Sequence, residues 1–369
     1  MPKSIGNSSE YTPTIRIGTV CCVSGPLSAW GTEAIKAIHI AVDHFNQTQS
    51  IQNKKIELIL GDSASNPEQG KNACEKLISQ GVIGIVGDLT SGISAQVAKS
   101  TFDKGIPMVT IGSRKDLTES GANVFRISYT DNFQGPLMAK FAYHELCLRK
   151  IALFTDRKQP YSVGLSDEFR AEFEKLGGKI VDEQFFESGQ TQFSAQLINI
   201  KAKNPDGLYV AAYFPEVGPL MRQAKSIGLD TYKLGTDGWD SRQILVSGGT
   251  AVLGGYYCTH YTPTEPRKEV QDFLKTWKAK YKVLPTAITT ALAYDAMCLM
   301  LDAVKRTKQL NSRALIYAIE NTTKLKGVTG TFTLKNKHGN PSKNAIIMML
   351  SPKGPVFQKS YSYDQFKGF

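Results

Sequence analysis

Hydrophobic and polar positions follow two different periods along the first half of the chain. Mostly apolar runs, which predict strands, alternate with segments whose apolar residues recur every three or four positions, as in amphipathic helices. Such a sequence of elements predicts an α/β fold, with a mainly parallel sheet covered by helices on both faces. The predicted strands are Thr14–Val23, Lys55–Gly61, Val82–Leu89 and Ile106–Gly112. The predicted helices lie within Ala34–Phe45, Asn66–Gly81 and Ser91–Lys104.

The same alternation starts again after Tyr129 and predicts a second open α/β unit. Its predicted strands are Lys150–Thr155, Lys179–Phe186, Gly207–Tyr213 and Tyr232–Gly235, and its helices are Val163–Leu176, Phe193–Lys203 and Val217–Ile227. Three helical patterns and three short strands follow, at Glu265–Tyr281, Thr286–Lys308, Arg313–Glu320, Val328–Leu334, Ala345–Leu350 and Val356–Lys359. Since no low-complexity linker separates the two units, we expect two lobes that several short crossings connect.

Composition is that of a globular protein. The 369 residues suffice for about two domains, and 41% are hydrophobic against 21% charged. The first residues, Met1–Pro13, are polar and lack the apolar stretch of a signal peptide. We therefore expect either a cytoplasmic protein or a mature form behind a new first methionine.

The net charge of +11 comes mostly from the end of the chain. Thr322–Phe369 contains eight lysines and one aspartate, and these lysines are spread between apolar residues and turn formers. They include Lys324, Lys326, Lys335, Lys337 and Lys343. Because no run of like charges occurs there, we expect a solvated basic edge and no nucleic-acid site.

Motifs of catalysis and cofactor binding are missing from the sequence. We find no nucleophile elbow, phosphate loop, dinucleotide fingerprint or zinc-ligand spacing, so we expect neither an enzyme nor a bound metal or cofactor. The six cysteines are Cys21, Cys22, Cys74, Cys147, Cys258 and Cys298. Several lie in apolar runs, and we expect all of them to be free thiols in the core.

Polar and aromatic residues follow the predicted strands at their carboxyl ends, where open α/β sheets bind ligands. Ser91 and Asp237 suit the ends of a small charged ligand, but each might equally cap a helical turn. Trp30, Tyr161 and Tyr213 suit the walls of a pocket, or they are ordinary core or surface aromatics. Their shared position at strand ends favours a binding site.

Several segments resemble type I periplasmic solute-binding proteins, in particular the leucine/isoleucine/valine-binding proteins of ABC importers. The matching pieces are SGPLSAWG, GDLTSG, PMVTIGSRKDLT, YVAAYFPEVGPLMRQAKSIGL, LGTDGW and ALAYDA. The resemblance implies a two-lobed fold joined by three crossings. It implies one lobe from 14–128 plus 258–335 and another from 129–257 plus 336–369, after an extension at 1–13. We expect hinges near Ser128–Asp131, Tyr256–Thr259 and Leu334–Asn340.

The resemblance also implies roles for single residues. Ser91 and Ser113, with the neighbouring backbone, match the groups that hold the ligand carboxylate, and Asp237 matches the acidic anchor of its ammonium group. The full set of implied ligand-binding residues is Trp30, Leu89, Thr90, Ser91, Gly112, Ser113, Tyr161, Tyr213, Asp237 and Thr289. Thr289 stands where the family has a large apolar residue. Ser65 and Thr90 stand at the family's disulfide positions, in agreement with free thiols.

The implied function is that of an extracytoplasmic receptor that binds an amino acid by hinge closure and delivers it to the membrane permease of an ABC importer. We expect a monomer in the periplasm or at the cell surface, without a nucleic-acid partner. A second hypothesis is a cytoplasmic sensor of a small amide or urea, as in the amidase-regulator branch of the same fold. An enzyme is the third hypothesis, which the missing motifs disfavour.

Overall fold

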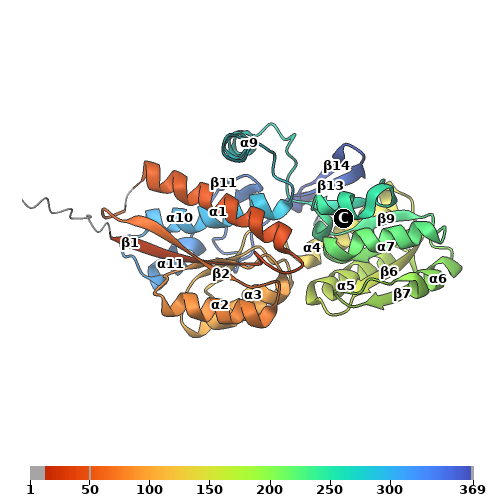
Figure 1. The fold of residues 1–369 in the computed structure, drawn as a ribbon, viewed down its shortest axis with the longest axis horizontal. Coiled ribbons are helices and arrows are strands. Elements are labelled where there is room, and N and C mark those ends of the chain that lie inside the picture. Colours follow the sequence, from red (N-terminus) through yellow and green to blue (C-terminus); the bar gives the residue numbers. More distant parts are fainter. Residues whose placement is uncertain (1–12, 50, 367–369) are drawn as a thin grey trace, which may run out of the picture.

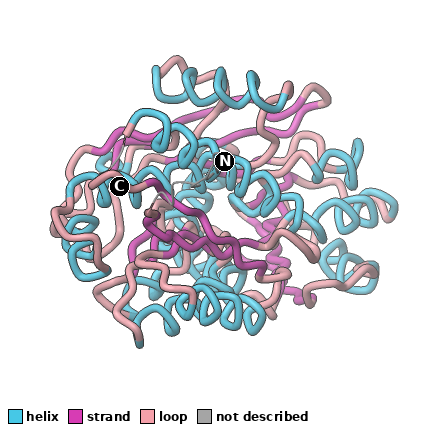
Figure 2. Tube along the Cα trace, turned by 60° about the vertical axis from the view of Figure 1, so that its left-hand side comes forward, coloured by secondary structure: helices cyan, strands magenta, loops and turns pink. Residues whose placement is uncertain are grey.

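Two lobes lie side by side along the long axis of the molecule (Figure 1). The computed structural model describes residues 13–49 and 51–366, so most of the expected extension at 1–13 lies outside the described residues. Each lobe is built on one sheet, of five and seven strands respectively. In a view turned by 60°, strands run through the middle of the molecule and helices surround them (Figure 2).

The five-stranded sheet is parallel throughout and has the order β2-β1-β3-β4-β5. Its strands are β1 (Thr14–Cys21), β2 (Lys55–Asp62), β3 (Ile85–Gly87), β4 (Met108–Thr110) and β5 (Val124–Arg126). Helices α1 (Ser28–Thr48) and α10 (Ile288–Arg306) pack together on one face, and α2 (Pro67–Ser79) and α3 (Ser91–Asp103) pack together on the other (Figure 1). This lobe also contains η1 (Lys115–Ser120), α9 (Lys268–Tyr281), α11 (Ser312–Glu320) and a hairpin of β11 (Leu325–Gly327) and β12 (Gly330–Phe332).

The seven-stranded sheet has the order β14-β13-β10-β9-β8-β6-β7, and its last two strands in the chain run antiparallel to their neighbours. Its strands are β6 (Lys150–Asp156), β7 (Lys179–Phe186), β8 (Gly207–Ala211), β9 (Tyr232–Gly235), β10 (Tyr256–Thr259), β13 (Ala345–Ser351) and β14 (Gly354–Tyr361). Its helices are α4 (Asp131–Lys140), η2 (Phe141–Glu145), α5 (Pro160–Lys175), α6 (Ser194–Ala202), α7 (Phe214–Ser226), η3 (Asp237–Trp239), α8 (Gln243–Gly248), η4 (Gly249–Ala251) and α12 (Tyr363–Phe366). The expected α/β architecture is confirmed.

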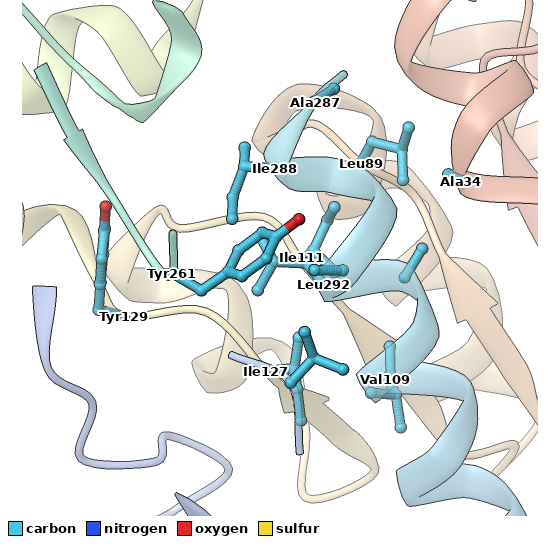
Figure 3. Packing of buried hydrophobic residues seen from close by; sticks show 14 of the residues in the cluster. Ala34, Leu89, Val109, Ile111, Ile127, Tyr129, Tyr261, Ala287, Ile288 and Leu292 are labelled. Carbon is cyan, nitrogen blue, oxygen red and sulfur yellow. The ribbon is translucent and has the colours of Figure 1, made fainter. Parts of the chain in front are cut away.

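One hydrophobic cluster extends through both lobes. Near the lobe interface, Tyr261 lies beside Ile288 and Leu292 of α10, with Ile111 behind them (Figure 3). Continuous packing of this kind means that the lobes are not independent domains on a flexible tether.

Three segments connect the two sheets, at 127–130, 260–267 and 333–344. The first and third overlap the segments Ser128–Asp131 and Leu334–Asn340, where hinges are expected. The second crossing begins directly after Tyr256–Thr259, near which the second hinge is expected, because this segment is strand β10 and pairs with Ile346–Met349 of β13. The connection follows Thr259, so the lobe boundary expected at 258 moves past the end of that strand.

Other differences have local causes. Strand β5 is only three residues long, which leaves no hydrophobic period to detect. Gly135 and Pro136 lie inside α4. Because both residue types are typical of turns, the sequence did not predict a helix there. The single strand expected at Val328–Leu334 is wrong, because Val328 and Thr329 form the turn between β11 and β12. By contrast, the helix predicted within Asn66–Gly81 is present as α2, and Asn66 caps it by accepting hydrogen bonds from the backbone N–H groups of Glu68 and Gln69.

Lys343 does not belong to a solvated edge. Its side chain is buried, and Nζ donates a hydrogen bond of 2.7 Å to the hydroxyl of Thr329, which in turn donates to the buried carboxylate of Asp295. Burial lowers the pKa of Lys343 and raises that of Asp295. The sequence could not reveal this, because Lys343 lies in the third crossing, which passes between the lobes.

Candidate functional site

A narrow cavity lies between the lobes. With one exception, the residues expected from the sequence surround it, because the carboxyl ends of both sheets face each other there. The cavity is lined by Trp30, Leu89, Ser91, Ile111, Gly112, Ser113, Tyr161, Tyr213, Asp237, Gly238, Ile288, Thr289 and Leu292. Only about 20 Å³ of space is free there, against roughly 300–1,000 Å³ for small-molecule sites, so the two walls are nearly in contact in this structure.

Thr90 is the expected residue that does not line the cavity. Its N–H and its hydroxyl both donate to the carboxylate of Asp88, at 2.9 and 3.3 Å. Asp88 also accepts a hydrogen bond from Ser63 and is fully buried. Thr90 therefore shapes the turn that leads into α3 and is not among the residues that line the cavity.

The wall from the five-stranded lobe is built around the first residue of α3. Ser91 Oγ accepts hydrogen bonds from the backbone N–H groups of Ser113, at 3.2 Å, and Arg114, at 3.1 Å. Since both bonds use the oxygen as acceptor, the hydroxyl proton remains available to donate to a ligand. The side chain of the N-cap residue Thr90 makes no cap bond to α3, and the N–H groups at the start of a helix attract anions.

Close approach of two loops explains the glycine in this wall. A Cβ atom at Gly112 would lie 2.8 Å from Leu117 Cδ1 and 3.2 Å from the Cα of Ser91. Any larger residue would push the loop after β4 away from the start of α3. Gly112 thus keeps Ser91 and Ser113 within hydrogen-bonding distance of each other.

The opposite wall is aromatic. Tyr161, at the start of α5, stacks on Tyr213 with ring centroids 4.7 Å apart, and Trp30 meets Tyr213 edge-on at 5.5 Å from the other lobe. The hydroxyl of Tyr213 lies against the backbone N–H of Ser91. The aromatic groups therefore cover an apolar space and bring a hydroxyl to the anion-binding end of α3.

Asp237 lies in the centre of a hydrogen-bond network. Its Oδ1 accepts from the Tyr161 hydroxyl at 2.5 Å and from the Gln134 amide at 3.1 Å, while its own N–H donates to Gln134 Oε1. The alternative interpretation of Asp237 as a helix cap is wrong. The cap of this turn is Thr236, whose hydroxyl accepts from the N–H of Gly238.

His260 approaches Asp237 from the second crossing. Its Nε2 is 3.3 Å from Asp237 Oδ2, and its ring stacks on Tyr129 with centroids 3.7 Å apart. Burial lowers the pKa of His260 to about 4, so the ring is neutral near pH 7. Because a carboxylate only accepts, the neutral ring donates from Nε2 and fixes the second oxygen of Asp237.

Asp131 is a buried carboxyl group that the sequence did not point to. Neither of its oxygens has a hydrogen-bond partner within the described part of the chain, and its N–H donates to the carbonyl of Ser113. Burial raises its pKa to about 7. Thr289 is similar in one respect, since its buried hydroxyl also lacks a partner and lines the cavity. Buried polar groups normally have partners, so Thr289 marks a position where a ligand could supply one, whereas Asp131 lies behind Ser113 and is not among the lining residues.

Four lining residues were missed. Ile111, Gly238, Ile288 and Leu292 lie beside residues that the strand ends identified, and Ile288 and Leu292 share the helical face of Thr289. The helical period of the segment contained this signal for the two α10 residues. The helical period alone does not show that the start of this helix reaches the cavity.

Within residues 13–49 and 51–366, no three His, Cys, Asp or Glu side chains gather as a metal site would require. Four cysteines are buried as expected, Cys298 is partly buried, and Cys147 is exposed, so the expectation of six core thiols is wrong for Cys147. No helix of the described residues is long and apolar enough to cross a membrane.

Comparison with known proteins is consistent with this picture over nearly the whole chain. Residues 14–355 match the model of a family described as periplasmic binding protein. Leu/Ile/Val-binding protein homolog 3 of Brucella melitensis is 28% identical over 333 residues, which are 89% of each chain. The Leu/Ile/Val-binding protein BraC3 of Rhizobium johnstonii is 31% identical over 288 residues, 77% of each chain.

Solved structures agree with the sequence relatives. The crystal structure of a leucine-binding protein, LivK, from Thermotoga maritima superposes with a TM-score of 0.91 and 31% identity, covering 95% of this chain and 100% of that one. LivJ from Streptococcus pneumoniae, a branched-chain amino acid transporter substrate-binding protein solved with isoleucine, gives 0.88 and 28%, covering 95% and 99%.

Proposed function

As the chain belongs to the periplasmic binding protein family, we propose that it is the amino-acid receptor of an ABC importer. It binds an α-amino acid with an aliphatic side chain in the cavity between its lobes and presents it to a membrane permease. The observation that carries this proposal is the opposition of Ser91, at the start of a helix, and Asp237, fixed by three neighbours, across one small cavity.

The polar ends of the cavity match the two charges of an amino acid. The hydroxyl of Ser91, the N–H groups at the start of α3 and the hydroxyl of Tyr213 supply donors for a carboxylate. Asp237 supplies an acceptor for an ammonium group, and Asp131 is a second carboxyl group beside Ser113. An ammonium ligand would add a second positive charge near the buried Asp131, whose pKa Arg126 already lowers in part.

The remaining surface of the cavity is suited to a hydrocarbon side chain. Leu89, Ile111, Ile288 and Leu292 contribute aliphatic groups, and Trp30 contributes an indole ring. Apolar contact of this kind favours a side chain by the area removed from water, at roughly 25 cal/mol per Å². Thr289 adds one hydroxyl, which favours side chains that carry an acceptor or leave room for water.

The relatives support the transport role over the alternative. Their names include leucine, isoleucine and valine binding, and the pneumococcal neighbour was solved with isoleucine. Family membership likewise supports a location outside the cytoplasmic membrane, in the periplasm or at the cell surface. The amide-sensor hypothesis is not favoured by these relatives. A simple amide would also leave one of the two anchors, for carboxylate and for ammonium, without a partner.

A screen of thermal stability against the twenty amino acids, urea and short amides tests the proposal. A ligand at a hundredfold excess over its Kd should stabilise the protein by about 2.7 kcal/mol, which raises the melting temperature. We expect leucine, isoleucine, valine or a similar aliphatic amino acid to act, and the matching amide and decarboxylated amine to fail. Stabilisation by acetamide or urea alone would overturn the proposal in favour of the sensor.

A further inference from the structure

Helix α10 begins at the interface between the lobes without a cap from its own segment. Its N-cap residue, Ala287, has no side chain that could accept a hydrogen bond, and its backbone is extended there. The first N–H groups of a helix have no acceptors within the helix and need them from elsewhere. The two residues that follow, Ile288 and Thr289, line the ligand cavity.

The missing acceptor comes from the other lobe. Asp240 follows η3, and its carboxyl group lies against the backbone N–H of Ile288 and accepts a hydrogen bond of 2.5 Å from the hydroxyl of Thr259. An acidic group is also favoured at this end of a helix by the helix dipole. Asp240 therefore performs across the interface what an N-cap residue performs within a helix.

Backbone contacts reinforce the same junction. The indole N–H of Trp30 donates to the carbonyl of Asp240 at 3.2 Å, and the N–H of Arg242 donates to the carbonyl of Thr286 at 2.9 Å. Ser241 and Ala287 form an isolated antiparallel bridge. These contacts join the segment after η3 to two separate elements of the five-stranded lobe, α1 and the start of α10.

Each half of the junction is fixed to its own lobe. On one side, Glu33 of α1 accepts hydrogen bonds from the N–H and the hydroxyl of Thr286, at 2.8 and 2.7 Å, and from the hydroxyl of Thr290 at 2.7 Å. On the other side, Thr259 is the last residue of β10 in the seven-stranded sheet. Rotation of the lobes away from each other would thus break the cap, while leaving both halves in place.

We propose that Asp240 is a positioning residue for ligand binding, which caps α10 across the lobe interface and so stabilises the closed form. The inference rests on the proposed function for its affinity readout, but Asp240 is not among the residues that line the cavity. If the closed form is the binding-competent one, a weaker cap lowers its population, and the apparent Kd rises in proportion.

Asp240→Ala and Asp240→Asn, compared by calorimetry with the best amino acid, test the cap. We expect the Ala variant to bind about tenfold more weakly, the size that a lost helix cap produces. Asn keeps an acceptor oxygen, and burial already raises the pKa of Asp240 to about 7, so the Asn variant should stay within about threefold of wild type. An Asn variant as weak as Ala, or an Ala variant with unchanged affinity, would overturn the assignment.

Two further variants separate capping from a general loss of stability. Thr259→Val removes the donor to Asp240 but keeps the size of the side chain, and it should weaken affinity by about threefold. Asn311→Ala is the matched control, because Asn311 caps α11 within one lobe by accepting from the N–H of Ala314. It should lower the melting temperature and leave affinity unchanged. Equal affinity losses in Asn311→Ala and Asp240→Ala would contradict the proposal.

Small-angle scattering keeps this test independent of the proposed function. Without ligand, Asp240→Ala should show a larger radius of gyration than wild type, because the closed population falls. If wild type binds none of the amino acids, the receptor function fails while this measurement still decides on the cap. An unchanged radius in ligand-free Asp240→Ala would reject the cap, whatever the ligand is.

Discussion

The two walls of the cavity present different chemical groups to a ligand. The wall of the five-stranded lobe offers hydroxyls, helical N–H groups and aliphatic side chains around Ser91, whereas the opposite wall offers stacked aromatic rings around the carboxylate of Asp237. A ligand with a single charge would use only one of these walls. An amino acid uses both, so its binding energy is available to hold the lobes together.

The walls also differ in how they are fixed. Ser91 is held by backbone groups of its own lobe, from Ser113 and Arg114. Asp237 is held by side chains from α4, from α5 and from the second crossing, in the form of Gln134, Tyr161 and His260. The first wall is therefore a local loop structure, while the second depends on packing next to the hinge. Variants in each wall should separate these two properties.

Loss of Asp237 should have the largest effect. Removing one partner of a buried ion pair costs about 2–5 kcal/mol, mainly because the other charge is left unpaired. Asp237→Ala should therefore lower amino-acid affinity by at least about thirtyfold in calorimetry, with a small change in the melting temperature of the free protein. Thr236→Val, which removes the actual cap of the turn, should instead cost about 1 kcal/mol of stability. Retained affinity in Asp237→Ala would show that the carboxylate does not face the ligand.

Loss of Ser91 Oγ should come next. A hydrogen bond to a charged group contributes about 1.5–3 kcal/mol, so Ser91→Ala should lower affinity by roughly tenfold to a hundredfold. Ser94→Ala on the same helix is its control, because Ser94 donates to the carbonyl of Asp88 and bonds Thr110, away from the cavity. We expect that control to lose stability and to keep its affinity. If both variants lose affinity equally, α3 contributes only structure to the first wall.

Asp131 should make ligand binding release protons, by an amount that depends on pH. Its pKa of about 7 lies above the ordinary value near 4, so a neighbouring ammonium group would shift it down. Between pH 6 and 7, binding should release up to about one proton, which calorimetry detects as an enthalpy that depends on the buffer. Asp131→Asn should abolish the release. Asp156→Asn is the control, since burial also raises the pKa of Asp156, which bonds Ser188 outside the cavity.

The raised pKa of Asp131 also predicts how the stability of the ligand-free protein changes with pH. Because the folded pKa of Asp131 is raised, the ionised form disfavours the folded state, and stability without ligand falls as the pH rises from about 4 to about 7. Asp131→Asn should therefore raise the melting temperature at pH 8 and change it little at pH 4. An equal change at both values would mean that Asp131 is ionised in the folded protein at pH 4.

The smallest effect should come from a hydroxyl of the second wall. Tyr161→Phe keeps the stacking on Tyr213 but removes the donor to Asp237 and the acceptor for the N–H of Gly238, and should weaken affinity by about fivefold, or ~1 kcal/mol. Tyr209→Phe is matched to it, because the Tyr209 hydroxyl is buried without a hydrogen-bond partner among the described residues. That control should be neutral or stabilising.

The sequence alone determined the architecture and most of the cavity lining. Hydrophobic periods identified the strands of both sheets except β5 and β10, and the carboxyl ends of parallel strands necessarily meet at one edge. Ser91, Ser113 and Tyr213 could therefore be placed together before any contact was known. The resemblance to a family then gave each of these residues an expected role.

Only the tertiary structure decided which side chains from distant parts of the chain hold the cavity residues in place. Gln134 and Asp237 are 103 positions apart in the chain, and Trp30 and Asp240 are 210 apart. No local pattern encodes such pairs, because hydrophobic periods report burial within an element and not which elements meet. For the same reason Asp237 could not be told from a cap, and Lys343 could not be told from a surface lysine. Their partners come from other crossings and lobes, and only packing brings them together.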